Sequence, residues 1–254
     1  MQLRIALCQT DIAWEQPARN LARLEPLVAG ADADVVVLPE LFATGFTLDP
    51  APVAEAPGGE VVTALRRWAV QYGKAVAGSV AVAEGGRFFN RMYFVTPDGG
   101  CARYDKRHLF APGGEARNYT PGSDRVVVGY RGFRFLLLVC YDLRFPVWSR
   151  CREDYDAILC CASWPASRRE AWRTLLHARA VENQCYVAGV NRVGDDPSGH
   201  YAGDSLLVDF KGRTLAEAGD REQTLSAAFD SDALEAFRCK FPAWRDADDF
   251  LIQM

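Results

Sequence analysis

The chain has 254 residues, of which 49% are hydrophobic and 24% are charged, and its formal net charge is −4 at pH 7. Acids and bases are interleaved, and no basic block indicates binding to nucleic acid or to an anionic membrane surface. No apolar run is long enough to cross a membrane, and the N-terminal residues lack the layout of a signal peptide, so we expect a soluble, cytoplasmic protein.

The first half of the chain alternates between strand and helix patterns. By hydrophobic periodicity we expect strands over 3–8, 35–38, 75–82, 88–96 and 101–104, and helices over 17–29 and 59–72. The stretch 106–122 has no periodicity and is rich in proline and glycine, which predicts a long loop. Loops of this length are usually functional or disordered.

The second half predicts a similar mixture. Further strands are expected over 126–128, 133–139, 157–162, 184–190 and 224–229, a hairpin over 205–210 and 213–216, and helices over 145–151, 168–182 and 231–237, the last capped by Ser231. No linker or repeat divides the chain. We therefore expect a single domain, residues 1–254, in which two sheets are covered by helices.

Cysteine is frequent, but its spacing does not indicate a metal site or a disulfide framework. The eight cysteines include no Cys-x-x-Cys pair, and the three histidines are scattered. We therefore expect no metal and no other cofactor. A free cysteine is most often a small buried side chain, so only its context can identify one that does chemistry.

Three polar residues each follow an apolar strand pattern directly or after one residue. Glu40 follows a buried β-branched run, Lys106 follows the strand 101–104, and Cys140 ends the apolar run 135–139. A carboxylate, an ammonium group and a thiol together suffice for nucleophilic catalysis by cysteine. Each residue also has a simpler interpretation, as a loop residue, a surface lysine or a buried thiol. Spacing alone does not place them in one site.

These residues lie in three blocks that resemble the nitrilase superfamily of carbon–nitrogen hydrolases. The blocks are residues 38–40 with the following Phe42, residues 104–110, and residues 140–146. The likeness continues through most of the chain, and it is greatest to the ω-amidase branch, whose bacterial members also carry the Phe-Pro-Ala-Trp segment found at 241–244.

The resemblance implies a four-layer αββα sandwich that pairs with a second subunit into a homodimer. It implies Glu40 as the general base, Lys106 as the stabiliser of the oxyanion and Cys140 as the nucleophile. Glu115, which its loop sequence alone would leave exposed, is implied as an auxiliary acid that orients the substrate and assists Lys106. The backbone N–H of Tyr141 is implied as the second oxyanion donor.

Arg144 lies four residues after Cys140. It could form an ion pair with Asp142 or Glu153, but in superfamily members that act on acidic substrates an arginine at this offset binds the substrate carboxylate, which suits its bidentate geometry. We favour this role. The predicted substrate is the ω-amide of a short 2-oxo dicarboxylic acid, such as 2-oxoglutaramate, which is hydrolysed to the oxo acid and ammonia through a cysteine thioester.

Four aromatic residues, Phe42, Phe110, Trp164 and Tyr201, could wall such a pocket or could equally belong to the core. Other functions stay open. An N-carbamoyl hydrolase or a nitrilase is less favoured, because the Tyr-Asp pair after the cysteine is typical of neither. A non-catalytic dimerising relative would be expected to lack one of the four implied catalytic residues, and a thiol redox enzyme would need a second, resolving cysteine.

Overall fold

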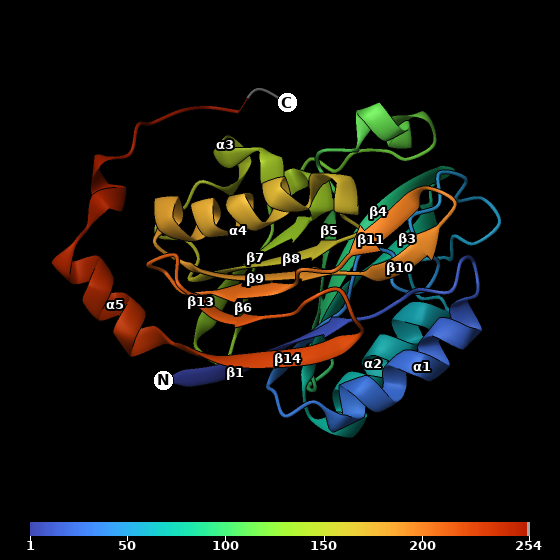
Figure 1. Cartoon of the computed structure of the whole chain (residues 1–254), viewed down its shortest axis with the longest axis horizontal. Helices are drawn as coiled ribbons and strands as arrows, with labels where there is room; N and C mark the ends of the chain where they lie inside the picture. The colour runs from blue at the N-terminus through green and yellow to red at the C-terminus, as the bar shows by residue number, and fades with distance from the viewer. Residues whose placement is uncertain (253–254) are drawn as a thin grey trace.

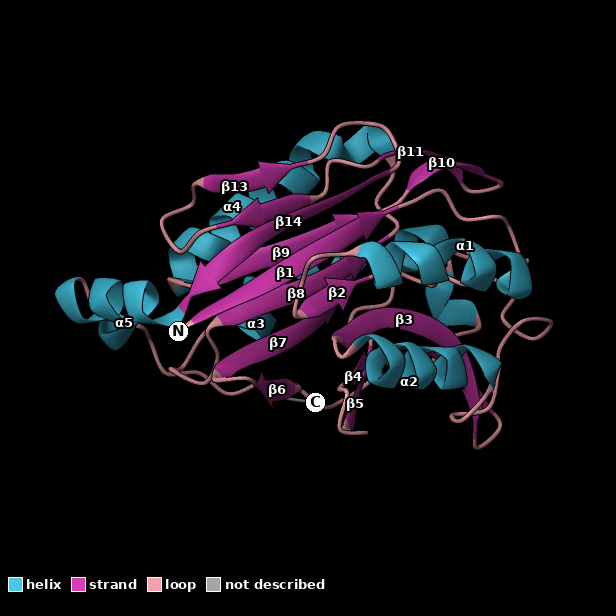
Figure 2. Ribbon diagram, turned by 90° about the horizontal axis from the view of Figure 1, so that it is seen from below, coloured by secondary structure: helices cyan, strands magenta, loops and turns pink. Residues whose placement is uncertain are grey.

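The computed structural model describes residues 1–252 and has four layers in the order helix, sheet, sheet, helix (Figures 1 and 2). The αββα arrangement implied by the resemblance is confirmed. Gln253 and Met254, the last two residues of the predicted domain, lie outside the described residues.

The first sheet is covered on its outer face by α1 (Pro17–Gly30) and α2 (Glu60–Tyr72). Its three central strands are parallel to one another, and the strand on either side of these three is antiparallel to them. One further strand at the edge is antiparallel to its neighbour and so runs parallel to the central three. The strand order is β14 (Gln223–Asp230), β1 (Gln2–Gln9), β2 (Val35–Val37), β3 (Ala75–Glu84), β4 (Arg87–Val95) and β5 (Cys101–Asp105).

The second sheet repeats this plan, with three parallel central strands. Its outer face carries α4 (Arg169–Asn183) and the short α3 (Pro146–Ser149). The strand order is β13 (Thr214–Glu217), β12 (Leu206–Val208), β9 (Tyr186–Asn191), β8 (Ala157–Ala162), β7 (Phe133–Val139) and β6 (Val127–Tyr130).

The alternation of side chains along each strand builds the core. In β1, Leu3, Ile5 and Leu7 belong to the apolar cluster shared by the two sheets, whereas Ala6 and Cys8 belong to the cluster under α1 and α2. Successive side chains of a strand point to opposite faces, so a strand buried on both faces is apolar throughout. This is why the central strands could be recognised as short uninterrupted apolar runs.

Two local features differ from the predictions. The hairpin of β10 (Val193–Asp196) and β11 (Gly199–Ala202) was not predicted, because its strands are short and largely polar. The helix α5 (Ser231–Lys240) is capped by Asp230, whose carboxylate accepts hydrogen bonds from the backbone N–H groups of Asp232 and Ala233, so the prediction of Ser231 as the cap was wrong.

The C-terminal part of the chain extends away from the sheets as an arm formed by α5 and the segment after it (Figure 1). Within residues 1–252, no helix is both long enough and apolar enough to cross a bilayer.

Candidate active site

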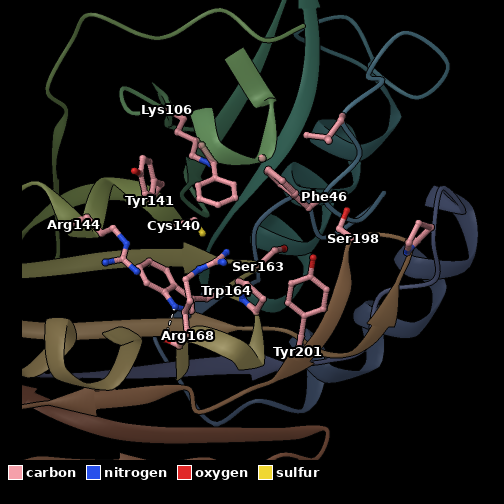
Figure 3. Close-up of a pocket in the computed structure, with 15 residues that line it drawn as sticks. Phe46, Lys106, Cys140, Tyr141, Arg144, Ser163, Trp164, Arg168, Ser198 and Tyr201 are labelled. Carbon is pink, nitrogen blue, oxygen red and sulfur yellow. Dashed lines mark hydrogen bonds between the residues drawn. The ribbon is translucent and has the colours of Figure 1, made fainter. Parts of the chain in front are cut away.

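The structure brings Glu40, Lys106, Glu115 and Cys140 into one site, although the first three come from the first sheet and its loops while Cys140 comes from the second. Lys106 and Cys140 follow β5 and β7 directly, and both line one cavity (Figure 3). The carboxyl ends of strands from two facing sheets therefore supply the polar groups of this site, as is usual for α/β folds.

Lys106 lies between two buried carboxylates. Its Nζ is 2.8 Å from Oε1 of Glu40 and 2.9 Å from Oε2 of Glu115, and all three side chains are fully shielded from solvent. Buried charges are costly unless they are paired and hydrogen bonded. Here one ammonium group serves two carboxylates, so the ammonium is held in place from two sides.

Glu115 is buried because the loop 106–122 folds back on the end of β5. Gly122 donates its N–H to the carbonyl oxygen of Lys106 at 3.0 Å, and a Cβ atom at Gly122 would lie only 2.2 Å from the carbonyl oxygen of Asp105. Only glycine fits this contact. Inside the loop, the N–H of Phe110 donates to Oε2 of Glu115 at 2.6 Å, which fixes the direction of the carboxylate.

Glu40 is held by the strand end that faces it. The N–H of Ser163, just after β8, donates to Oε2 of Glu40 at 2.8 Å, and the Ser163 hydroxyl donates to the backbone carbonyl of Glu40 at 3.2 Å. The next residue, Leu41, has a φ of +46°, a conformation that side-chain-bearing residues adopt rarely and mostly where function or packing imposes it. The carboxylate of Glu40 therefore has a defined orientation.

Asn90 completes the charged cluster and is not among the site residues predicted from the sequence. It lies within β4, is fully buried, and its Nδ2 donates to Oε1 of Glu40 at 2.8 Å and to Oε1 of Glu115 at 3.1 Å. Its Oδ1 has no hydrogen-bond partner in the described part of the chain. A signal existed, because an amide in the middle of an apolar strand pattern must find partners inside the protein.

Cys140 occupies a strained turn that Asp142 stabilises. Cys140 has a φ of +47°. The buried carboxylate of Asp142 accepts hydrogen bonds from the backbone N–H of Val139 at 3.0 Å, the backbone N–H of His108 at 2.8 Å and the hydroxyl of Tyr104 at 2.8 Å. Asp142 therefore ties the turn of Cys140 to the segment that carries Lys106, and the strain is compensated by this network.

Burial and the neighbouring charges set the protonation of the site. Burial raises the pKa of the Cys140 thiol well above its usual value, and the negative charge of Glu40 raises it further, while Lys106 opposes them. Burial alone would lower the pKa of Lys106, but Glu115 and Glu40 outweigh this effect and hold that pKa well above its usual value. Burial also raises the pKa of Glu115, against the attraction of Lys106. The thiol is therefore protonated near neutrality and needs a base, whereas the lysine stays cationic.

The cavity above these groups has a volume of about 320 Å³. Of the residues predicted to bind substrate, Tyr141, Arg144, Phe110 and Trp164 line it, as Figure 3 shows for those that it labels. Tyr201, which the sequence left open between pocket wall and core, lines it too.

Phe42 does not line this cavity, so the prediction that it binds substrate is wrong. It is fully buried in the cluster under α1 and α2 and packs against Gly78 of β3. Phe46 lines the cavity instead, with its ring 5.3 Å from Nζ of Lys106. Both residues lie in an irregular turn, where no periodicity indicates which side chain faces inward.

Arg144 has no carboxylate partner among residues 1–252. Asp142 is bonded to other groups, as described above, and Glu153 forms no ion pair with Arg144. The guanidinium carbon of Arg144 instead lies 4.8 Å from the centre of the Trp164 ring. The two ion pairs that the sequence offered as alternatives are therefore not formed, and the guanidinium is free to meet an anion in the cavity.

Comparison with known proteins gives a consistent result. Residues 4–238 match the family described as carbon–nitrogen hydrolase. The chain is 47% identical to an ω-amidase of Yersinia enterocolitica over 98% of both chains, and 35% identical to a 2-oxoglutaramate amidase of Bacillus subtilis over 97% of this chain and 98% of that one. A solved CN-hydrolase superfamily protein from Xanthomonas campestris, with an arsenic adduct in its active site, is 42% identical over 100% of both chains, with a TM-score of 0.97. The chain belongs to the carbon–nitrogen hydrolase family.

Proposed function

We propose that this protein is an ω-amidase that hydrolyses the terminal amide of a short 2-oxo dicarboxylic acid monoamide, such as 2-oxoglutaramate, to the oxo acid and ammonia. The observation that carries the proposal is one cavity with a thiol and a doubly paired lysine at its floor and an arginine without a carboxylate partner in its wall. The full-length similarity to an ω-amidase and to a 2-oxoglutaramate amidase supports it.

The first half-reaction forms a thioester. Cys140 transfers its proton to Glu40 and its sulfur attacks the amide carbon, so that the carbonyl oxygen becomes an oxyanion. Lys106 and the backbone N–H of Tyr141 stabilise that charge. The carbon–nitrogen bond then breaks, and Glu40 returns the proton to the departing nitrogen, which leaves as ammonia.

The second half-reaction consumes water. Glu40 takes a proton from a water molecule, whose oxygen attacks the thioester carbon, and the same two donors stabilise the new oxyanion. The carbon–sulfur bond breaks, the sulfur of Cys140 regains a proton, and the acid is released. Glu115 takes no proton in this scheme. It keeps Lys106 aimed at the oxyanion and shares with Glu40 the task of keeping it charged.

Arg144 binds the carboxylate at the other end of the substrate. A guanidinium group presents parallel N–H donors that match the two oxygens of a carboxylate. The Trp164 ring beneath it holds the guanidinium in position without neutralising it. Phe110 and Trp164 form the apolar walls between this anchor and the thiol.

We also propose that the whole chain, residues 1–254, acts as one domain in a cytoplasmic homodimer that needs no cofactor and no nucleic acid. The C-terminal arm supports an assembly, because it exposes Phe241 and Leu251, whose relative exposures are 60% and 93%. Burial of such side chains against a second copy is favourable. Sedimentation equilibrium tests this: a wild-type dimer that becomes monomeric on truncation after Lys240 is expected, and a wild-type monomer would contradict the proposal.

The test of the activity is ammonia release from a panel of amides and a nitrile. The panel contains 2-oxoglutaramate, 2-oxosuccinamate, glutamine, a carbamoyl amino acid and an aliphatic nitrile, and Cys140→Ala is the control. Turnover of the oxo-acid amides by the wild type and not by the variant is expected. No reaction with either oxo-acid amide, alongside turnover of the carbamoyl compound, would reject the ω-amidase proposal.

A further inference from the structure

Two adjacent arginines, Arg168 and Arg169, have opposite environments. Arg169 forms a two-pronged ion pair with the buried Asp204, at 3.0 Å from Nε and 2.8 Å from Nη2. Arg168 forms no ion pair with any residue that the structure describes, and it lines the cavity above Cys140. Its guanidinium carbon lies 5.0 Å from the centre of the Phe110 ring. Like Arg144, it is supported by an aromatic ring and not by a carboxylate.

Trp164 lies next to both of these arginines. Arg144 stacks on its ring, and its Nε1 donates to the backbone carbonyl of Arg168 at 2.9 Å. Figure 3 shows the indole between the two side chains. The backbone of Arg168 is thus fixed at the end of the short helix Ala166–Arg168, before α4 begins. Trp164, a residue of the cavity wall, therefore fixes the backbone position of Arg168.

The cavity therefore has an excess of positive charge at this wall. None of the described residues that line it is acidic. The charge of Lys106 is offset by the two carboxylates behind it, Glu40 and Glu115. The charges of Arg144 and Arg168 are not offset by any carboxylate among residues 1–252. They therefore attract or repel the substituent on the carbon next to the substrate carboxylate, according to its charge.

We propose that Arg168 is the residue that selects a 2-oxo group over a 2-ammonium group beside the substrate carboxylate. This inference rests on the proposed function and adds a second anchor to it. If Arg144 takes the carboxylate, Arg168 is placed to donate to the adjacent 2-oxo oxygen or to share a carboxylate oxygen. An amino-acid amide such as glutamine would bring an ammonium group next to two guanidinium groups, with no carboxylate to receive it. Selection by such a repulsive contact is a general route to specificity.

The experiment compares kcat/KM for 2-oxoglutaramate and for glutamine across variants. Arg168→Gln is expected to lower kcat/KM for the oxo-acid amide by about tenfold or more, the loss typical of a hydrogen bond to a charged group. Arg168→Glu is expected to lower it further and to raise kcat/KM for glutamine, because the new carboxylate can accept the ammonium group. Arg168→Lys keeps the charge and is expected to retain the preference for the oxo acid. Arg66→Gln, which removes an exposed arginine of α2, is the control and should change neither value.

The outcomes separate the inference from the function on which it rests. If the wild type hydrolyses 2-oxoglutaramate but Arg168→Gln and Arg168→Glu keep the wild-type kcat/KM for both substrates, Arg168 is a solvated surface residue and the inference is wrong. An equal loss on both substrates would indicate structural damage and would also overturn it. If the wild type does not hydrolyse the oxo-acid amide at all, the proposed function itself fails.

Discussion

At the floor of the cavity, Lys106 is enclosed with Glu40 and Glu115, and each charged atom of these three side chains has a partner inside the protein. In the wall of the cavity, Arg144 and Arg168 rest on aromatic rings and have no carboxylate partner among residues 1–252. The two regions belong to one cavity, yet the charges of the floor are paired within the protein and the charges of the wall are not.

This difference in pairing indicates different roles for the floor and the wall of the cavity. At the floor, the desolvation of the charges is a cost of folding, and their fixed directions leave little to reorganise when the oxyanion forms. In the wall, the charges stay partly hydrated until a substrate supplies the counter-charge. Changes at the floor should therefore affect rate and stability together, and changes in the wall should affect the choice of substrate with little effect on stability.

The largest effect is expected for Lys106→Met. Loss of an oxyanion donor typically costs about 10²–10³ in turnover. Removal of one partner from a buried ionic cluster typically costs about 3–5 kcal/mol of stability, because Glu40 and Glu115 are left without their cation. Ammonia release and urea denaturation measure the two effects. A variant as stable as the wild type would show that the cluster is more hydrated than its burial indicates.

The pH dependence of this loss has a defined sign. Lys106 lowers the pKa of Glu115, which burial already raises, so without the lysine that pKa rises further. The carboxyl group takes up a proton in acid, and the loss of stability in Lys106→Met should therefore be smallest at low pH and grow as the pH rises. Lys106→Met/Glu115→Gln should recover part of the stability at neutral pH but none of the activity.

A second effect on the floor, smaller than that of Lys106→Met in turnover, is expected for Asn90→Leu. It removes two hydrogen bonds to carboxylates, each worth about 1.5–3 kcal/mol when the partner is charged, and we expect a fall in kcat of about tenfold or more with a loss of stability comparable to that of Lys106→Met. The pKa of Glu115 should rise further, which would move the acid limb of the pH–rate profile to higher pH.

Ser79→Ala is the matched control for Asn90→Leu. Ser79 is equally buried and accepts a hydrogen bond from the backbone N–H of Leu41 at 2.9 Å, but it forms no hydrogen bond to either carboxylate. Ser79→Ala should therefore lower the stability of the protein without shifting its pH–rate profile. A pH profile of Asn90→Leu that matches the wild type would contradict the positioning role of Asn90.

The identity of the residues at the floor was more predictable from the sequence than their burial and contacts. Cys140, Lys106 and Glu40 each follow a strand pattern closely, and the resemblance joined them to Glu115. The burial of Glu115 was not predictable, because it depends on the contact of Gly122 with the backbone of β5, which leaves no local pattern. Periodicity likewise located the central strands of both sheets but not the polar β10–β11 hairpin.

The resting protonation of Cys140 gives a third way to test the floor. The raised pKa of the thiol predicts that its labelling by iodoacetamide keeps increasing above neutral pH, with no plateau in acid. Because the charge of Glu40 contributes to the raised pKa, Glu40→Gln should shift the labelling curve to lower pH while it abolishes turnover. Peptide mass spectrometry follows the label at Cys140. A labelling curve that stays at the wild-type position would show that the charge of Glu40 does not reach the sulfur.

The smallest effect is expected for Arg144→Gln, in the wall of the cavity. Because the Arg144 side chain is partly exposed and makes no ion pair with residues 1–252, we expect the melting temperature of the variant to match that of the wild type. We expect kcat/KM for 2-oxoglutaramate to fall by about tenfold, the lower end for a hydrogen bond to a charged group. A neutral aliphatic amide of similar length, such as valeramide, lacks the carboxylate and should react as before.

Arg150→Gln is the control for Arg144→Gln, because Arg150 donates to the carbonyl oxygen of Glu182 and does not line the cavity. An equal fall on both amides would contradict a carboxylate-binding role, and the wall would then differ from the floor only in its exposure.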